Sequence, residues 1–395
     1  MNFEVSKRMA AVDSSAVAEI LKSSTDPDII SLAGGNPNPA LFPNKELADI
    51  AREILLEKPI QSLQYGRTDG YPQLIEKIAE RLKRVEGIDC GNDSILVTAG
   101  ATQAIELTAK VVLNEGDIVI AEEPSFLGAF NAFKSYGAKI LGVKMKDGCM
   151  DLDEFERLIS ENENVKLLYV IPSFQNPMGT CMSLENRKAL YEIIRKHQLI
   201  TIEDNPYGDL TFDGVRIPTL KSMDTEDLIV YCGSFSKIVA PGLRVGYALC
   251  NKEIAERMSA AKQLADVHST LLPQLMIEEY MERYDLDELI EKMRSSYAHK
   301  CKTMLDAIAE YFPEDVAYTK PNGGLFIWCD IGHGVDTYEL AKRAAESKVA
   351  FVPGNVFMVD TTERCSALRL NYSNMSDENI VEGVRRLGEL IKKEI

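Results

Sequence analysis

Short apolar runs and amphipathic stretches alternate along the middle of this chain. Each apolar run is rich in Val, Ile and Leu and ends in a polar or glycine-containing loop. A continuous apolar run between turn residues predicts a buried strand, and apolar positions three or four residues apart predict a helix. The expected strands cover residues 94–99, 117–122, 138–144, 165–171, 199–203, 228–232 and 245–250. The expected helices cover residues 13–24, 44–56, 72–86, 104–113, 152–161 and 184–197.

Strands that alternate with helices form a mostly parallel sheet, so the chain is predicted to have an α/β fold. Such sheets bind ligands beyond the carboxyl ends of their strands. Several chemically useful residues fall at these ends, namely Gly100, Phe126, Asn176, Asp204, Tyr207 and Lys237. Their shared position predicts a ligand site along one edge of the sheet.

The pattern changes after residue 257. It is mostly helical as far as residue 311, with one long helix expected at residues 286–311. The expected elements that follow are strands at 323–330, 349–353 and 368–372 and helices at 337–348 and 378–393. A separate α+β pattern predicts a second, smaller domain. We therefore expect residues 1–30 to join the small domain, residues 31–285 to form a large ligand-binding domain, and residues 286–395 to form the small domain.

Composition narrows the possible functions. The chain has 395 residues, is 45% hydrophobic and carries a net charge of −17. This charge argues against nucleic acid or an anionic membrane as the main partner. The eight cysteines include no C-x-x-C pair, which fits a reduced, cytoplasmic protein. The sequence has no apolar run long enough to span a bilayer and no recognisable metal motif.

The loop after the strand at 228–232 carries the most specific chemistry. It presents Ser234, Ser236 and Lys237, and Arg244 follows seven residues later. A lysine just beyond a buried strand can be desolvated, which lowers its pKa and makes its amine a nucleophile toward carbonyls. The hydroxyls and the arginine suit a phosphate. The pattern indicates pyridoxal phosphate held by the lysine, and the alternative for a lone lysine is a solvated loop residue.

Two small-residue turns add to this interpretation. Gly100, Ala101 and Thr102 precede a helix, where exposed backbone N–H groups suit an anion, although many such turns bind nothing. Gly34 and Gly35 lie in a stretch that also contains prolines and cannot continue a helix. That stretch is either a simple turn or backbone that lines a ligand site.

The other requirements of this cofactor also have candidates. A buried carboxylate must face the pyridine nitrogen, and Asp204 is the candidate unless it only caps a turn. Asn176 and Tyr207 could face the phenolic oxygen, and Phe126 could lie against the ring. Arg369 could bind the α-carboxylate of an amino acid in bidentate fashion, or it could be a surface arginine on an edge strand.

These segments together resemble the fold-type I, class I/II aminotransferases over nearly the whole chain. The subgroup that the chain resembles contains 2-aminoadipate and kynurenine aminotransferases and the effector domains of some transcription regulators. The matching segments are Ser31-Leu-Ala-Gly-Gly35, Gln64-Tyr65-Gly66, Thr98-Ala-Gly-Ala101, Pro172-Ser-Phe-Gln-Asn-Pro-Met-Gly179, Glu203-Asp204, Ser234-Phe-Ser-Lys237, Gly242-Leu-Arg244-Val-Gly246, Pro321-Asn-Gly-Gly324, Leu368-Arg369-Leu370 and Ala261-Lys-Gln-Leu-Ala-Asp-Val-His268.

The resemblance implies a fold and a set of roles. The large domain would hold a mostly parallel seven-stranded sheet between helices and would bind pyridoxal phosphate. Lys237 would be the Schiff-base lysine and proton shuttle, Asp204 would hold the pyridinium, and Arg369 would bind the α-carboxylate with help from Asn176. The segment around Gly35 would close over the substrate. A homodimer with shared active sites is implied, in which Tyr65 reaches the phosphate of the partner subunit.

The implied activity is ping-pong transfer of an amino group between an L-amino acid and a 2-oxo acid, with 2-oxoglutarate as the expected 2-oxo acid. The implied specificity is broad, or is directed to 2-aminoadipate, aromatic or branched-chain substrates. Some aminoadipate-specific relatives place an arginine where this chain has Ala18, and Arg8 or Arg67 could replace it. Two alternatives stay open, a lyase or decarboxylase on the same fold and a non-enzymatic regulatory module. The acidic charge and the absence of a helix-turn-helix segment count against the module.

Overall fold

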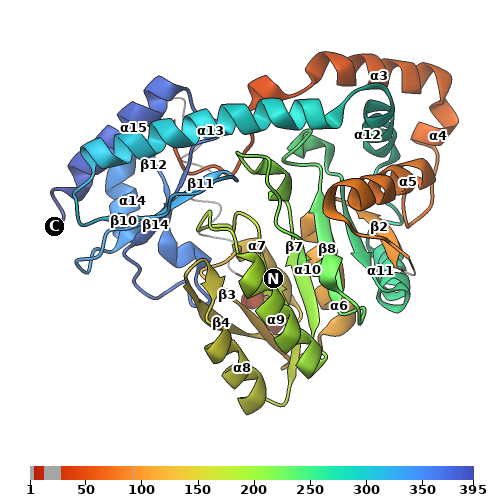
Figure 1. Ribbon diagram of the computed structural model, residues 1–395, viewed down its shortest axis with the longest axis horizontal. Helices are drawn as coiled ribbons and strands as arrows, with labels where there is room; N and C mark the ends of the chain where they lie inside the picture. Colours follow the sequence, from red (N-terminus) through yellow and green to blue (C-terminus); the bar gives the residue numbers. More distant parts are fainter. Residues whose placement is uncertain (1–3, 13–27, 92) are drawn as a thin grey trace.

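A computed structural model describes residues 4–12, 28–91 and 93–395 of the chain. Its larger sheet has eight strands in the order β2-β9-β8-β7-β6-β3-β4-β5 (Figure 1). The strands are β2 (Ser94–Thr98), β3 (Ile118–Glu123), β4 (Lys139–Lys146), β5 (Cys149–Met150), β6 (Val165–Val170), β7 (Ile200–Asp204), β8 (Ile229–Ser234) and β9 (Gly246–Cys250). β9 and β5 run opposite to the other six strands, so the pairs β2–β9, β9–β8 and β4–β5 are antiparallel and the remaining pairs are parallel. The seven expected strands are confirmed, and the eighth is a two-residue strand that pairs with the end of β4.

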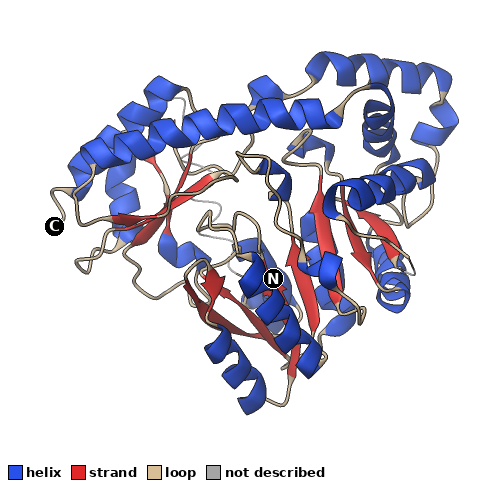
Figure 2. Cartoon of the chain, in the orientation of Figure 1, coloured by secondary structure: helices blue, strands red, loops and turns tan. Residues whose placement is uncertain are grey.

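Helices cover both faces of this sheet, which explains the continuous apolar character of its strands. Figure 2 shows the strands in red with blue helices on either side. Alternate residues of one strand enter different cores: Leu167 and Tyr169 enter one, and Leu168 and Val170 enter the other. The helices are α6 (Ala101–Val112), α7 (Leu127–Ser135), α8 (Leu152–Glu161), α9 (Leu184–His197), α10 (Leu220–Met223), α11 (Lys252–Ala265) and α12 (Leu271–Arg283).

The second sheet has four strands, in the order β10-β11-β14-β13, and all its pairs are antiparallel. A separate two-stranded pair joins β1 to β12 in parallel, so residues 30–31 lie beside a C-terminal strand. The strands are β1 (Ile30–Ser31), β10 (Ala317–Tyr318), β11 (Phe326–Asp330), β12 (Val349–Ala350), β13 (Val352–Pro353) and β14 (Ala367–Asn371). The division of the chain at residues 30/31 and 285/286 stays a prediction.

Helix α13 (Leu286–Tyr311) runs across the molecule from the region of α3 and α12 to α15 (Figure 1). It begins as expected, because the Asp285 carboxylate accepts hydrogen bonds from the N–H groups of Asp287 and Glu288. The remaining helices are α1 (Lys7–Ala10), α3 (Asn44–Glu57), α4 (Pro59–Leu63), α5 (Pro72–Arg81), α14 (Thr337–Glu346) and α15 (Asp377–Ile391).

Several expected boundaries differ from the structure. The predicted helix 72–86 is α5 followed by a π-helical turn, Leu82–Glu86, which ends at the left-handed Gly87. The predicted helix 104–113 begins three residues earlier, at Ala101. The predicted strand 349–353 is two strands, because its first half pairs with β1 and its second half with β14. Helix α7 was not predicted, and the expected helix 13–24, with Ala18, lies outside the described residues.

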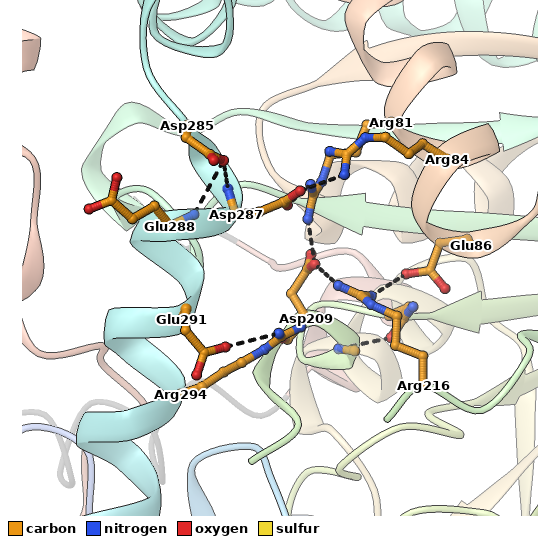
Figure 3. Close-up of polar contacts among 12 residues, drawn as sticks. Arg81, Arg84, Glu86, Asp209, Arg216, Asp285, Asp287, Glu288, Glu291 and Arg294 are labelled. Carbon is orange, nitrogen blue, oxygen red and sulfur yellow. Dashed lines mark hydrogen bonds and ion pairs between the residues drawn. The ribbon is translucent and has the colours of Figure 1, made fainter. Parts of the chain in front are cut away.

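A network of arginines and carboxylates joins α5, α13 and the 3-10 turn Gly208–Leu210 (Figure 3). Arg81 bonds through Nη2 to Oδ1 of Asp209 at 2.5 Å and through Nη1 to Oδ1 of Asp287 at 2.6 Å. Arg84 bonds to the other oxygen of Asp287 at 2.5 Å, and Arg216 bonds to Asp209 as well. Because Asp209 follows Tyr207 by two residues, the network anchors one of the loops at the carboxyl edge of the large sheet.

The cysteines, the apolar helices and the possible metal ligands complete the description of the chain. All eight cysteines are free thiols. Within residues 4–12, 28–91 and 93–395, no helix is long and apolar enough to cross a membrane. The same residues hold no group of three or more His, Cys, Asp or Glu side chains placed to bind a metal ion.

The two arginines that share Asp287 should differ in their effect on stability. The Arg81 side chain is 10% exposed and that of Arg84 is 62% exposed. Arg81→Met leaves Asp209, whose side chain is only 20% exposed, with one partner fewer, so we expect the free energy of unfolding to fall by about 3 kcal/mol. Arg84→Met removes a surface ion pair and should cost less than about 1 kcal/mol. Urea unfolding followed by circular dichroism measures the free energy of unfolding of both variants. Equal losses in the two variants would contradict the prediction that the less exposed Arg81 contributes more to stability than Arg84.

Candidate functional site

A cavity of about 410 Å³ lies at the carboxyl edge of the large sheet, where loops meet residues from the second sheet. Its lining includes nearly all of the predicted site residues, namely Gly35, Ala101, Thr102, Phe126, Asn176, Asp204, Tyr207, Ser234, Ser236, Lys237, Arg244 and Arg369. Gly100 and Tyr65 do not line it. Asn36, Ile105, Ile171, Pro206, Pro241 and Phe326 complete the lining and were not predicted.

Lys237 follows β8, and its side chain points across the cavity. Its Nζ donates a hydrogen bond to the carbonyl oxygen of Gly35 at 2.7 Å. Burial lowers the pKa of Lys237 to about 8, and the positive charges of Arg369 and Arg244 add to this effect. Near neutral pH this amine is therefore unprotonated far more often than that of an ordinary lysine. Because of this contact, Lys237 is not a solvated loop lysine, and the backbone at Gly35 lines the site and is not a simple turn.

Asp204 ends β7 and is 3% exposed. Its Oδ2 accepts a hydrogen bond from the Tyr169 hydroxyl at 2.8 Å, whereas Oδ1 has no partner among the described residues. Burial raises the pKa of Asp204 to about 7, and the bond from Tyr169 acts in the opposite direction. The residue that caps the following turn is Asn205, whose Oδ1 accepts from the Gly208 N–H at 3.1 Å. Asp204 therefore has an oxygen available for a cationic N–H donor.

An anion site is formed at the N-terminus of α6. Gly100 precedes the helix with a φ of 86°, and a β-carbon at this residue would lie 2.4 Å from Nη2 of Arg244. Glycine is thus required both by the backbone conformation and by the close approach of the arginine. The first N–H groups of a helix have no partner within it, so those of Ala101 and Thr102 are available to an anion. Gly100 shapes this site without lining the cavity.

Arg244 and two serines complete the anion site. Arg244 donates from Nη2 to the carbonyl oxygen of Ala99 at 2.9 Å and from Nη1 to Oγ of Ser236 at 3.4 Å. The Ser236 N–H donates to Oγ of Ser234 at 3.1 Å. A guanidinium, two hydroxyls and a helix N-terminus together suit a phosphate group.

Arg369 lies on β14, between β11 and β13, and is 7% exposed. The alternative of a surface arginine on an edge strand is therefore wrong. Its Nη1 donates to Oδ1 of Asn176 at 2.8 Å and its Nη2 to the carbonyl oxygen of Ala33 at 2.7 Å, while Nε has no partner among the described residues. Its Cζ lies 4.2 Å from the ring centre of Phe326. Burial lowers the pKa of Arg369 to about 10. A buried cation without an ion pair in the described chain favours an anionic ligand.

Three aromatic residues, Phe126, Tyr207 and Phe326, border the cavity, and a fourth, Tyr65, lies away from it. Phe126 precedes α7, and the ring of Tyr207 packs edge-on against Phe326 with centres 5.7 Å apart. Burial raises the pKa of Tyr207 above its usual range, whereas Arg369 acts to lower it. Tyr65 is 80% exposed and contacts the ring of His268, so it does not reach the cavity of its own chain.

Sequence reasoning missed two residues that matter here, Tyr169 and Phe326. Both lie in apolar runs, in β6 and β11, where an aromatic residue is usually core. The sequence alone carries no signal for the role of Tyr169. In the structure Tyr169 pairs with Ile202 on β7, and Ile202 lies two residues before Asp204, so the side chains of Tyr169 and Asp204 lie on one face of the sheet.

Known proteins resemble this chain over nearly its whole length. The family model for aminotransferase class I and II matches residues 27–387. Aromatic-amino-acid aminotransferase 1 of Thermococcus litoralis is 36% identical over 394 residues, which cover 99% of this chain and 94% of the relative.

Solved structures agree with this result. The kynurenine aminotransferase of Pyrococcus horikoshii, solved in complex with PMP, is 37% identical with a TM-score of 0.94, and the match covers 99% of this chain and 97% of that one. The α-aminoadipate aminotransferase of Thermus thermophilus, complexed with N-(5'-phosphopyridoxyl)-L-leucine, is 38% identical with a TM-score of 0.90, and the match covers 98% of this chain and 97% of that one. The expected fold-type I architecture is confirmed.

Proposed function

This chain belongs to the class I and II aminotransferase family, and from that premise we propose that it transfers amino groups in two half-reactions at Lys237. It is an aminotransferase whose cofactor is pyridoxal phosphate. In the first half-reaction an L-amino acid gives its amino group to the cofactor and leaves as its 2-oxo acid. In the second, another 2-oxo acid, for which we propose 2-oxoglutarate, takes the amino group and leaves as an amino acid.

The observation that carries this proposal is the meeting of three incompletely paired groups in one cavity. These are the Nζ of Lys237, the Oδ1 of Asp204 and the guanidinium of Arg369. They fit an aldehyde-bearing cofactor with a ring nitrogen and a substrate with a carboxylate.

When bound, pyridoxal phosphate supplies an aldehyde that condenses with amines and a ring that accepts the electron pair left on the substrate's α-carbon. The free oxygen of Asp204 suits the protonated ring nitrogen. The donors that would hold the phosphate are the N–H groups of Ala101 and Thr102, the hydroxyls of Ser234 and Ser236, and Arg244. Asn176 and Tyr207 would face the phenolic oxygen, and Phe126 would lie against the ring.

Lys237 has two tasks in this scheme. Its amine would hold the cofactor's aldehyde carbon and would be released when a substrate amine takes its place. The released Nζ would be the base that removes the proton from the substrate's α-carbon and the acid that gives this proton back. The lowered pKa of Lys237 suits both tasks, because a neutral amine is needed each time. Positioned bases of this kind typically contribute about 10²–10⁴ in rate.

Arg369 would bind the substrate's α-carboxylate. Its Nη1 is oriented by Asn176, and its plane lies over the ring of Phe326. Retention of the carboxylate by a fixed guanidinium favours chemistry at the α-proton over decarboxylation. Gly35, opposite Lys237, would form the near wall of the substrate space.

For the donor substrate we propose L-amino acids with aromatic, branched-chain or 2-aminoadipate side chains. The relatives are named for aromatic amino acids, kynurenine and α-aminoadipate. Neither Arg8 nor Arg67 lines the cavity of its own chain, and Arg67 is paired with Asp69. Their suggested role in place of an arginine at position 18 therefore has no support here.

We also propose a homodimer in which Tyr65 of one subunit reaches the phosphate of the other. Tyr65 is exposed beside Leu56, Ile60 and Leu63 of α3 and α4, which are 68%, 78% and 71% exposed. Exposed apolar side chains that cluster in this way favour a protein interface.

A mixing experiment tests this dimer. Tyr65→Ala and Lys237→Ala variants are each expected to be slow or inactive, and mixing them should restore activity, because one site of a hybrid dimer has both residues intact. A monomer by light scattering, or mixing without any recovery, would contradict the shared site.

The visible spectrum tests the two half-reactions. We expect the band of the cofactor-loaded enzyme to shift to shorter wavelength when a suitable L-amino acid is added and to return with 2-oxoglutarate. Lys237→Ala should still bind pyridoxal phosphate, but its spectrum should not complete the cycle. Product formation without loss of the original band, or failure of every 2-oxo acid to restore it, would contradict this mechanism and favour a lyase.

A further inference from the structure

The hydroxyl of Tyr169 is the only hydrogen-bond donor that the described residues supply to the carboxylate of Asp204. Tyr169 is fully buried in β6, and its ring packs edge-on against Phe133 of α7 with centres 5.6 Å apart. Its hydroxyl lies 2.8 Å from Oδ2 of Asp204. The ring therefore has little freedom, and its one polar atom is directed at one oxygen of the carboxylate.

We propose that Tyr169 is a positioning residue that turns the free oxygen of Asp204 toward the cofactor's ring nitrogen and keeps the carboxylate charged. This inference rests on the proposed function, in which Asp204 faces that nitrogen. The bond to Oδ2 fixes the rotation of the carboxylate, so Oδ1, which has no partner, is left for the ligand. The phenol of Tyr169 donates this hydrogen bond and carries no charge of its own. It therefore stabilises the carboxylate anion without competing with the cationic ring nitrogen for it.

The surroundings show why such a donor is needed. The titratable groups that face Asp204 are Tyr169 on β6, Glu122 on β3, Cys232 on β8 and Tyr207 in the following loop. None of them carries a positive charge. Burial raises the pKa of both Asp204 and Glu122 to about 7, so either carboxyl could be neutral near physiological pH.

Tyr169 donates a hydrogen bond to only one of these two carboxyl groups. Glu122 accepts instead from the Ile171 N–H at 3.0 Å and from Nε2 of Gln175 at 3.3 Å. The Tyr169 hydrogen bond lowers the pKa of Asp204, and the negative charge of Asp204 in turn raises that of Glu122. The hydrogen bond from Tyr169 thus favours the charged form of the carboxylate that lines the cavity.

The test compares two cofactors in the loaded enzyme. Pyridoxal phosphate and its 1-deaza analogue, in which a carbon replaces the ring nitrogen, share the aldehyde and the phosphate. Their dissociation constants are measured by fluorescence titration for the wild type and for Tyr169→Phe. Because a hydrogen bond to a charged group is lost, we expect the preference for pyridoxal phosphate over the analogue to fall about tenfold or more.

A matched control separates this effect from simple loss of a buried hydroxyl. Tyr231 on β8, which lies on the other side of β7 from β6, is also buried, and its hydroxyl accepts from Nδ2 of Asn205 at 2.9 Å. Tyr231→Phe should leave the preference between the two cofactors unchanged, and Asp204→Asn should abolish it. If Tyr169→Phe weakens both cofactors equally, the residue is merely structural and the proposal is overturned.

Two further outcomes are distinguishable. If the wild type binds neither cofactor, the proposed function itself fails. If Tyr169→Phe does not fold, 3-fluorotyrosine at position 169 takes its place, because its more acidic hydroxyl donates a stronger hydrogen bond. The preference for pyridoxal phosphate should then rise above that of the wild type, and an unchanged preference would overturn the proposal.

Discussion

Burial of incompletely paired charged groups is the constraint that governs this molecule. Lys237, Asp204 and Arg369 lie in one cavity, and their hydrogen-bond partners among the described residues are all neutral groups. Removing such groups from water costs free energy unless a ligand or a hydrogen bond compensates. The folded chain without its ligand therefore retains electrostatic cost at the cavity, which binding of an anionic, aldehyde-bearing cofactor and a carboxylate substrate relieves. This is the arrangement in which perturbed pKa values mark a functional site.

The rest of the fold supports these three groups with neutral partners. A backbone carbonyl accepts from Lys237, a phenol donates to Asp204, and an amide oxygen accepts from Arg369. Each contact orients the side chain and leaves its charge uncancelled. Ion pairs are found instead away from the cavity, as in the Arg81 network, where they join α5 to α13. Charged side chains thus stabilise the fold in the Arg81 network, where they are paired, and are available to bind ligands in the cavity, where they are not.

Much of the large sheet and of the candidate site could be predicted from the sequence, because the sequence patterns that indicate them are local. Buried parallel strands are continuous apolar runs, and Lys237, Asp204 and Asn176 stand directly after three of them. What could not be predicted depends on contacts distant in sequence. The strand expected at 349–353 is two strands because its first half pairs with β1 and its second half pairs with β14. The contact of Tyr169 with Asp204 could not be predicted, because it forms only when β7 lies beside β6. Arg369 could be buried or exposed until the order of the second sheet was known.

Chemical trapping of the bound cofactor tests the central claim most directly. Borohydride reduces the carbon–nitrogen double bond between pyridoxal phosphate and the amine that holds it, and this leaves a stable label. After digestion and mass spectrometry, the account predicts a phosphopyridoxyl group on Lys237 alone, with the label lost when the L-amino acid substrate is added before reduction. A label on another lysine, or none on a protein that has bound the cofactor, would contradict it.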